Sequence, residues 1–398
     1  MMYKTLQAPA PQIKPGGRNQ QKNIRYLAVL GQNPLLSLAE LSAALPDMKI
    51  IAQKNEAVVF SAKNEVEPGR LGGCPKIAEF IGEFPPDVKK IGEAISQELF
   101  SFSKEQKIFF GLSFYGSANK NFYNSLGKSI KFRLTENGYK VRWVVSRELA
   151  LSSVLIKTNK LLTRGTDFDL FFSPGKIIVA KTVAVQDFSD YEFRDIKRPA
   201  RDLVSGMTPP KLAKMMINLG GRQKKIFDPF CGSGTFLMEA ALLGFKKIYG
   251  SDVSEKAVAD TKKNLAWLKE KYNFSADIEV RQCDVRNSYA CWNKKFDFIA
   301  TEPYLGPALR GKISSEKALA LRKELEKNYR EYLTALSKIL EKNGLLVIIV
   351  PFIIGENGIV KISLKIEGAG LEAVREPIPY CRPDQKVGRE IYILRKVC

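Results

Sequence analysis

Apolar and polar positions alternate along the C-terminal half of the chain in the way that a sheet covered by helices requires. Short apolar runs, which predict buried strands, fall at residues 225–227, 247–250, 278–281, 296–300, 344–350 and 390–395. Longer segments with helical spacing lie between them, at residues 209–219, 236–243, 255–271 and 312–341. Strands that alternate with helices predict an α/β fold with a doubly wound sheet.

The N-terminal half has a different pattern. Strand-like runs fall at residues 24–31, 57–62, 108–114, 139–145 and 176–186. Helical spacing appears at residues 37–46, at the basic amphipathic stretch 124–134 and at residues 152–160. This mixture predicts an α+β region that precedes the doubly wound domain.

The junction FDPFCGSGT, residues 227–235, joins a strand, a glycine turn and a helix start. Gly232 and Gly234 permit a tight turn that a ligand can approach closely, and the free amides at the following helix start favour polar oxygens. A dinucleotide-binding turn would place a third glycine where Leu237 stands. Asp228 instead supplies a carboxylate, which repels a pyrophosphate but suits a cofactor that carries an ammonium and a sulfonium group.

The turn resembles the first cofactor motif of class I S-adenosylmethionine-dependent methyltransferases, in the D-P-x-C-G-x-G-T form of enzymes that methylate amino groups of nucleic-acid bases. The resemblance implies a Rossmann-like catalytic domain and S-adenosyl-L-methionine as cofactor. Asp252 lies 18 residues beyond Gly234, close to the spacing at which an acid reaches ribose hydroxyls, and a helix cap in DVSEKAV is an alternative role that can coexist with this one. The resemblance also implies that Asp284 accepts a hydrogen bond from the adenine amino group and that the Val285 backbone donates one.

A segment before the glycine turn allows two interpretations. Thr208 is a suitable N-cap with Pro209 at the first helical position, so the segment could be a packing helix. In the methyltransferase class this element closes over the cofactor, and Met207, Thr208 and Pro209 would then touch it. The predicted cofactor-binding residues are Thr208, Asp228, Pro229, Phe230, Cys231, Gly232, Gly234, Thr235, Asp252, Val253, Asp284 and Val285.

A second motif, TEPYLGP, follows the strand at residues 296–300. It resembles the D/N-P-P-Y motif of amino-methylating enzymes, most closely the T-D-P-P-Y-G form of the tRNA guanine-N2 methyltransferases. Glu302 stands where Asp is usual, while Tyr304 occupies the position of the second proline and Leu305 that of the tyrosine. The predicted catalytic residues are Thr301, Glu302, Pro303 and Tyr304.

The chemistry of an exocyclic base amine explains these residue types. Its lone pair is delocalised into the ring, so catalysis depends on positioning and hydrogen bonding. Glu302 and a carbonyl of Thr301 or Pro303 would accept from the amine, and Tyr304 would stack on the base. Such a base must be unpaired or flipped out.

Composition narrows the class of partner. A chain of 398 residues predicts two or three domains. Its net charge of +21 and pI near 9.6 favour a polyanionic partner. Residues 101–164 carry a net charge of +9, whereas residues 51–100 carry −2. A solvated basic face without a partner is the alternative interpretation of the first segment.

Histidine and cysteine usage excludes other chemistry. The chain has no histidine, which excludes imidazole-based triads, histidine metal sites and histidine phosphotransfer. Its six cysteines form no C-x-x-C pair, so we predict neither a metal site nor a disulfide framework. No apolar run approaches the roughly 20 residues of a membrane span, and residues 1–23 show no signal-peptide core. A soluble, cytoplasmic protein is expected.

The basic middle region resembles a THUMP domain, the RNA-binding module of several tRNA-modifying enzymes. The resemblance rests on FYNSLGKSIKFRL, on LALSSVLIKTNKLLTRGTDFDLFF and on IIVAKTVAVQDFSDYEFRD, which is interpreted as a strand. The expected phosphate contacts are Lys128, Lys131, Arg133, Arg142, Arg147, Lys157, Lys160 and Arg164, although each alone could be an ordinary surface charge. The expected organisation is a flexible basic tail (1–23), a ferredoxin-like α+β module (24–100), a THUMP-type RNA-binding domain (101–192), a linker (193–206) and a class I methyltransferase domain (207–398).

Together these motifs predict an S-adenosylmethionine-dependent tRNA methyltransferase that forms N2-methylguanosine, similar to the archaeal and eukaryotic enzymes acting on guanosine 10. A DNA or rRNA base amino-methyltransferase would use the same two motifs and remains an alternative. A cofactor-free RNA-binding protein with a decayed catalytic half is a second alternative, which the intact glycine turn and Asp252 disfavour. Eukaryotic relatives use a small activating protein partner, and this sequence does not predict whether such a partner is needed.

Overall fold

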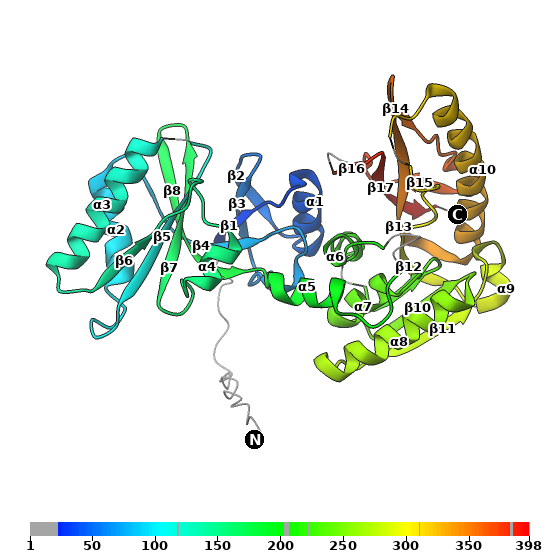
Figure 1. The fold of residues 1–398 in the computed structure, drawn as a ribbon, viewed down its shortest axis with the longest axis horizontal. Helices are drawn as coiled ribbons and strands as arrows, with labels where there is room; N and C mark the ends of the chain where they lie inside the picture. The colour runs from blue at the N-terminus through cyan, green and yellow to red at the C-terminus, as the bar shows by residue number, and fades with distance from the viewer. Residues whose placement is uncertain are drawn as a thin grey trace.

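The computed structural model of the chain describes residues 23–117, 119–202, 207–221, 223–309, 311–382 and 385–397. They form two sheets that lie side by side along the long axis of the molecule, with α1 and α6 between them (Figure 1). The predicted flexible tail falls almost entirely outside the described residues. Within the described ranges, no helix has both the length and the apolar character that crossing a membrane demands.

The N-terminal sheet has eight strands in the order β2-β3-β1-β4-β8-β7-β5-β6. The strands are β1 (Ile24–Val29), β2 (Lys49–Gln53), β3 (Ala57–Ala62), β4 (Lys76–Phe84), β5 (Ile108–Tyr115), β6 (Val141–Val144), β7 (Gly165–Ser173) and β8 (Lys176–Val185). The helices of this half are α1 (Pro34–Ala44), α2 (Val88–Leu99), α3 (Lys120–Glu136) and α4 (Ser153–Thr158). This arrangement confirms the predicted α+β region. Strand β4 of the expected first module pairs with β8 of the expected second module, so one sheet contains strands from both sides of residue 100. The domain boundary expected at that residue stays a prediction.

Helices α2 and α3 pack together on this sheet. Leu126, Ile130 and Leu134 of α3 are fully buried against a core that includes Phe110 and Phe168. The opposite side of α3 is open to solvent, as the amphipathic pattern predicts.

The segment after β8 differs from the sequence prediction. The stretch IIVAKTVAVQDFSDYEFRD is not one strand, because the chain ends β8 at Val185 and forms helix α5 (Phe188–Ile196). Asp187 caps this helix by accepting hydrogen bonds from the backbone amides of Ser189 and Asp190. Asp187 follows directly after the strand-like run at residues 176–186, and its residue type, which favours N-caps, was the sequence signal for a helix start.

A buried carboxylate joins the two halves. Glu40 of α1 accepts hydrogen bonds of 2.7 Å from the amides of Gly72 and Gly73, and another of 2.7 Å from the side-chain amide of Asn218 in α6 (Pro210–Leu219). Burial raises the pKa of Glu40, while these donors lower it. The amide of Asn33 also donates to the Pro379 carbonyl at 2.5 Å.

The C-terminal sheet has the main order β11-β10-β9-β12-β13-β17-β15, with β14 paired to β13 and β16 to β17. Its strands are β9 (Lys225–Asp228), β10 (Lys247–Asp252), β11 (Asp277–Gln282), β12 (Phe296–Thr301), β13 (Leu340–Gly355), β14 (Gly358–Lys361), β15 (Leu371–Ala373), β16 (Ile378–Tyr380) and β17 (Val387–Lys396). The strands from β11 to β13 are parallel, and β17 is antiparallel to β13. The predicted doubly wound α/β domain is therefore confirmed.

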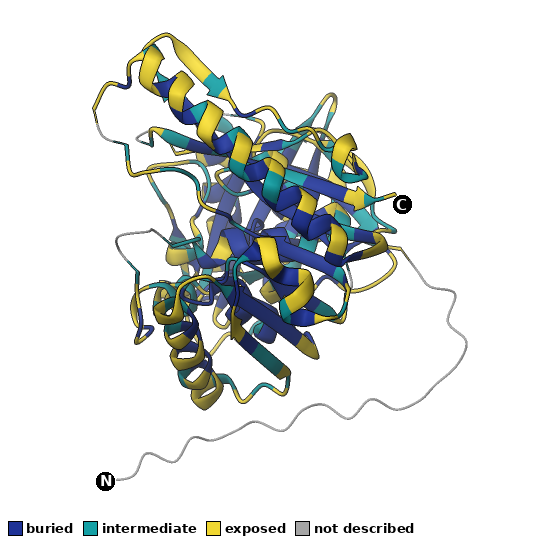
Figure 2. Cartoon of the chain, turned by 90° about the vertical axis from the view of Figure 1, so that its right-hand side faces the viewer, coloured by how far each residue is buried: buried dark blue, intermediate teal, exposed yellow. Residues whose placement is uncertain are grey.

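Helices cover both faces of this sheet. They are α7 (Thr235–Leu242), α8 (Glu255–Tyr272), α9 (Ser288–Trp292) and α10 (Ser315–Ile339). One buried cluster lies under α6, α7 and α8, and a second lies under α10. Figure 2 shows the resulting layers, with buried strands beneath helices whose outer faces are exposed.

Two cysteines depart from the expectation that there would be no disulfide. Cys283, just after β11, is bonded to Cys291 in α9, with the two Cα atoms 6.4 Å apart. The short helix α9 turns the chain back toward the strand end within eight residues, which sequence spacing alone does not reveal.

Candidate functional site

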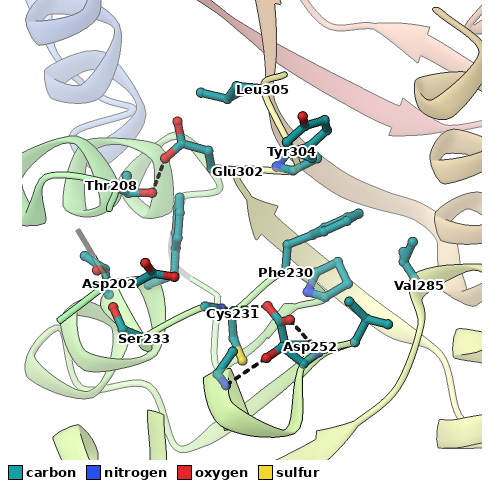
Figure 3. A pocket seen from close by; sticks show the side chains of 18 of the residues that line it. Asp202, Thr208, Phe230, Cys231, Ser233, Asp252, Val285, Glu302, Tyr304 and Leu305 are labelled. Carbon is teal, nitrogen blue, oxygen red and sulfur yellow. Dashed lines mark hydrogen bonds between the residues drawn. The ribbon is translucent and has the colours of Figure 1, made fainter. Parts of the chain in front are cut away.

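A pocket of about 540 Å³ opens at the carboxyl ends of β10 and β12, where doubly wound sheets place their ligands (Figure 3). Two of its walls come from motifs found in the sequence, the glycine turn after β9 and the TEPYLG segment after β12. A third wall comes from the segment before α6, including Met207 and Thr208.

The glycine turn adopts the backbone conformation that its residue types predict. Gly232 and Gly234 have φ angles of 51° and 90°, which other residues rarely adopt. Oδ2 of Asp252 accepts a hydrogen bond of 3.0 Å from the Gly232 amide, and Oδ1 accepts one of 3.0 Å from the Ser254 amide (Figure 3). Ser254, rather than Asp252, caps helix α8. Asp252 therefore holds the turn and lines the pocket at the same time.

Asp228 lies behind the pocket wall instead of on it. Its carboxylate is 1% exposed, and Oδ1 accepts hydrogen bonds from the Thr301 hydroxyl at 2.6 Å and the Phe230 amide at 3.1 Å. Its Oδ2 is buried and has no hydrogen-bond partner within the described residues. Burial raises the pKa of Asp228 to about 7, and the negative charges of Asp252 and Glu302 add to this effect.

The far end of the pocket is formed by the segment after β11. Asp284 and Val285 both line it, as does Arg286. The Asp284 carboxylate accepts hydrogen bonds from the Arg286 amide at 2.9 Å and the Arg286 guanidinium at 3.1 Å. The Cys283–Cys291 disulfide lies immediately beside this wall.

Glu302 lies at the opposite end, between two donors. Nε of Arg389, on β17, donates to its Oε1 at 2.6 Å. The hydroxyl of Thr208 donates to its Oε2, as Figure 3 shows. The side chains of Arg389 and Glu302 are only 13% and 10% exposed. The prediction that Thr208 is a helix N-cap is wrong, because α6 begins one residue later behind Pro209 and the Thr208 hydroxyl serves Glu302.

Tyr304 and Leu305 complete this end of the pocket. The Tyr304 side chain is open to a ligand, since the residue is 48% exposed. Its backbone carbonyl accepts a hydrogen bond of 3.4 Å from the hydroxyl of Tyr329, a buried residue of α10. Tyr329 also donates to the Ile349 carbonyl at 3.0 Å, which fixes the turn against β13.

The structure brings most of the predicted residues together. The pocket is lined by Thr208, Pro229, Phe230, Cys231, Gly232, Thr235, Asp252, Val253, Asp284, Val285, Glu302, Pro303 and Tyr304. Asp228, Gly234 and Thr301 are not among its lining residues, and neither is Pro209. The roles of all these residues in binding and catalysis stay predictions.

Sequence reasoning missed several lining residues. They are Asp202, Ser233, Phe236, Ser254, Lys256, Ala257, Asp260, Arg286, Gly306, Tyr332 and Arg389. Arg389 had a signal, since it is a cation within the largely apolar run that forms the last strand. Its neighbour in the pocket is 87 residues away in sequence, so only the sheet order could pair them.

The expected phosphate contacts lie on α3, β6, α4 and the segments that follow them. Of the eight residues, all but Arg133 are exposed. Arg133 forms an ion pair with Glu93 at 2.8 Å, and Lys157 forms one with Asp187 at 2.7 Å. Phe132, between Lys131 and Arg133, is 66% exposed.

Comparison with solved structures confirms the two-part fold. The crystal structure of TrmN from Thermus thermophilus is similar over 94% of this chain and 100% of that chain, with a TM-score of 0.52 and 16% sequence identity. At this identity the similarity shows the fold alone. The similarity extends over both halves of the chain.

Sequence comparison identifies the family to which the C-terminal half is similar. The family described as UPF0020, RMKL-like, methyltransferase domain, matches residues 200–352. The tRNA (guanine(10)-N2)-dimethyltransferase of Methanothermobacter thermautotrophicus is 32% identical over 179 residues, which is 44% of this chain and 48% of that protein. The chain thus spans about half or less of the length of this protein and of two further curated relatives.

A shorter relative is covered more fully. The probable tRNA (guanine(10)-N2)-dimethyltransferase of Methanothermococcus thermolithotrophicus is 31% identical over 144 residues, which is 34% of this chain and 77% of that protein. The match agrees with the pocket geometry, in which the glycine turn faces an acid after the fourth parallel strand. The chain therefore belongs to the tRNA (guanine(10)-N2)-dimethyltransferase family.

Proposed function

We propose that this protein transfers methyl groups from S-adenosylmethionine to N2 of a guanosine in tRNA, with guanosine 10 as the target expected from the family. One observation carries the proposal: a single pocket contains both the glycine turn with Asp252 and the segment with Glu302, Pro303 and Tyr304. A cofactor at the first wall and a base at the second would meet in the same cavity.

The residues present fit the cofactor. Asp252, Asp284 and Val285 line the same pocket, so Asp252 would offer acceptors to a ribose while Asp284 and the Val285 backbone would contact the adenine edge. Phe230 supplies an apolar surface between them. Oδ2 of Asp228 is buried and orphaned behind the turn, and a positively charged ligand in the pocket would favour the ionised form of this carboxyl.

The cofactor supplies an activated methyl group whose leaving group needs no protonation. The amine loses one proton when its nitrogen takes the methyl group, so the chain's own task is to position the amine and to offer Glu302 as the acceptor of that proton. Glu302 accepts a hydrogen bond from the exocyclic amine, and the carbonyl of Pro303 or Thr301 accepts a second one. Tyr304 stacks on the flipped base, because the residue lines the pocket and is open to a ligand. Positioning of this kind is a recognised source of rate enhancement.

The N-terminal half supports tRNA as the substrate class. Its exposed cations on α3, β6 and α4 belong to the segment with a net charge of +9. Each phosphate contact would add affinity that falls with salt. The buried Glu40 hydrogen bonds fix this half against α6, so a bound RNA would keep a defined position relative to the pocket.

Transfer of labelled methyl groups tests the proposal. The protein is incubated with labelled cofactor and with bulk tRNA, ribosomal RNA or duplex DNA, and labelled tRNA is then digested and analysed by mass spectrometry. We expect label only in tRNA, as N2-methylguanosine or N2,N2-dimethylguanosine. Label in DNA or ribosomal RNA alone would contradict the proposal, and no label together with no cofactor binding by calorimetry would identify a non-catalytic RNA-binding protein.

A further inference from the structure

The ion pair between Arg389 and Glu302 presents an ordered row of hydrogen-bonding groups. Arg389 Nε lies 2.6 Å from Oε1 of Glu302, and Oε2 faces Thr208 on the other side. Within the described residues, the two terminal nitrogens of Arg389 make no hydrogen bond, and the residue lines the pocket. Since each carboxylate oxygen can accept more than one hydrogen bond, Oε1 and Oε2 retain capacity for a ligand.

The row therefore reads donor, acceptor, acceptor, from Arg389 to the Thr208 side of Glu302. The Watson–Crick edge of guanine reads acceptor, donor, donor, from O6 through N1–H to the N2 amine. The two sequences are complementary, in the same sense in which the edge of cytosine is complementary to that of guanine.

We propose that Arg389 and Glu302 together select guanine, with Arg389 donating to O6 and Glu302 accepting from N1–H and N2–H. The inference rests on the proposed methyl transfer and adds the element that chooses the base. In this arrangement the N2 amine lies opposite Oε2, on the side of Thr208. Thr208 belongs to the pocket wall that precedes α6.

The same row repels the other amino bases. Adenine would place its N6 donor against the Arg389 donor and its N1 acceptor against Oε1. Cytosine presents a donor and then an acceptor, which is also the wrong order. The side chains of Arg389 and Glu302 are only 13% and 10% exposed, so a mismatched base would leave their polar groups without hydrogen-bond partners. Binding sites reject close analogues in this way.

The pair also explains how a glutamate serves at position 302. A longer side chain has one more rotatable bond than aspartate, so it needs restraint to hold one geometry. Arg389 and Thr208 each donate a hydrogen bond to one oxygen of Glu302, and these two hydrogen bonds supply the restraint. Base recognition and side-chain restraint would then be performed by the same guanidinium.

Substituted tRNAs separate base recognition from catalysis. The target guanosine is replaced by 2-aminopurine or 2,6-diaminopurine nucleosides, which keep the 2-amino group but lack O6 and N1–H. For the unaltered protein we expect kcat/KM to fall at least roughly 10- to 100-fold on these substrates. Arg389→Met should lower kcat/KM on guanosine and should shrink the ratio between guanosine and 2-aminopurine.

A matched control is available on the same strand. Arg395 is also on β17, but its side chain is 44% exposed and pairs with Glu372 away from the pocket. Arg395→Met should leave the guanosine to 2-aminopurine ratio unchanged. Thermal unfolding of both variants shows whether each is folded. If Arg389→Met does not fold, Arg389→Gln replaces it, and because glutamine keeps a neutral donor this variant should retain part of the guanosine to 2-aminopurine ratio.

The possible outcomes distinguish the proposed methyl transfer from guanine selection by Arg389 and Glu302. If the unaltered protein methylates no tRNA, the proposed function fails. If it methylates guanosine and 2-aminopurine equally well, the proposed function stands and guanine selection by this pair is wrong. If the Arg389 variants lose activity on all substrates with an unchanged ratio, Arg389 only positions Glu302, and its assignment as a base-reading residue is overturned.

Discussion

The hydroxyl of Thr301 lies 2.6 Å from Oδ1 of Asp228, and this hydrogen bond ties the end of β12 to the end of β9. The two residues start the two motifs that face each other across the pocket. Both are buried, at 0% and 1% exposure, so the bond is shielded from water. A change at either residue should therefore reach both walls of the site.

Asp228 should make the stability of the protein depend on pH. Burial raises its pKa from about 3.8 to about 7, so the folded protein holds this proton more tightly than the unfolded chain. The stability that this group contributes is present at pH 4 and is lost as the pH rises through 7. Between pH 5 and 8 the loss should be on the order of 2–3 kcal/mol.

The measurement compares urea unfolding of the unaltered protein and Asp228→Asn at several pH values. The asparagine variant should lack this part of the pH dependence, because it carries no titrating group. Parallel pH curves for the two proteins would show that the Asp228 carboxyl does not titrate in this range.

Asp252 should control cofactor affinity through the shape of the turn. Asp252→Ala removes the acceptor of the Gly232 and Ser254 amides as well as the predicted ribose contact. Loss of hydrogen bonds to a charged group costs about 1.5–3 kcal/mol, or roughly 10- to 100-fold in the dissociation constant. Calorimetric titration with S-adenosylmethionine measures the change. The exposed Asp277 at the start of β11 serves as control, and Asp277→Ala should bind normally.

Glu302→Gln should separate tRNA binding from turnover. The amide keeps one acceptor but loses the charge that pairs with Arg389, so the amine is held less well in the transition state. We expect turnover to fall by orders of magnitude while tRNA affinity, measured by filter binding, stays nearly normal. Glu324→Gln, on an exposed acid of α10 near Tyr304, is the matched control. Near-normal turnover of Glu302→Gln would remove Glu302 from the mechanism.

Glu40 should be a stability determinant at the junction of the two halves. Glu40→Ala leaves the amides of Gly72 and Gly73 without an acceptor in a buried site and removes one of the two acceptors of the Asn218 side-chain amide. Buried donors left unpaired cost about 1–3 kcal/mol each, so we expect a loss of several kcal/mol. Differential scanning calorimetry checks the loss. Glu56→Ala, which affects an exposed acid that accepts from Gly116, should change the melting temperature far less.

The sequence was sufficient for the features that depend on local pattern. The alternation of apolar runs predicts the doubly wound sheet, and Gly232 and Gly234 predict the tight turn that the structure shows beside the pocket. Strand ends after β10 and β12 could be located because parallel strands place their carboxyl ends at one edge.

What escaped prediction depends on contacts between distant segments. Arg389 reaches Glu302 only because β17 runs antiparallel beside β13, and nothing near Arg389 in sequence indicates that order. Thr208 has the sequence of an N-cap, yet a carboxylate 94 residues away takes its hydroxyl. The Cys283–Cys291 pair likewise depends on where α9 turns the chain.

The Thr208 hydroxyl has a thermodynamic consequence. It connects the wall beside the predicted cofactor with the carboxylate beside the predicted base, so an occupant of one subsite alters the restraint felt at the other. Linkage is reciprocal: if the cofactor tightens binding of the target nucleoside, the nucleoside tightens binding of the cofactor by the same factor. The affinities of the two ligands should therefore be coupled by one common factor, and Thr208→Val should make their affinities independent.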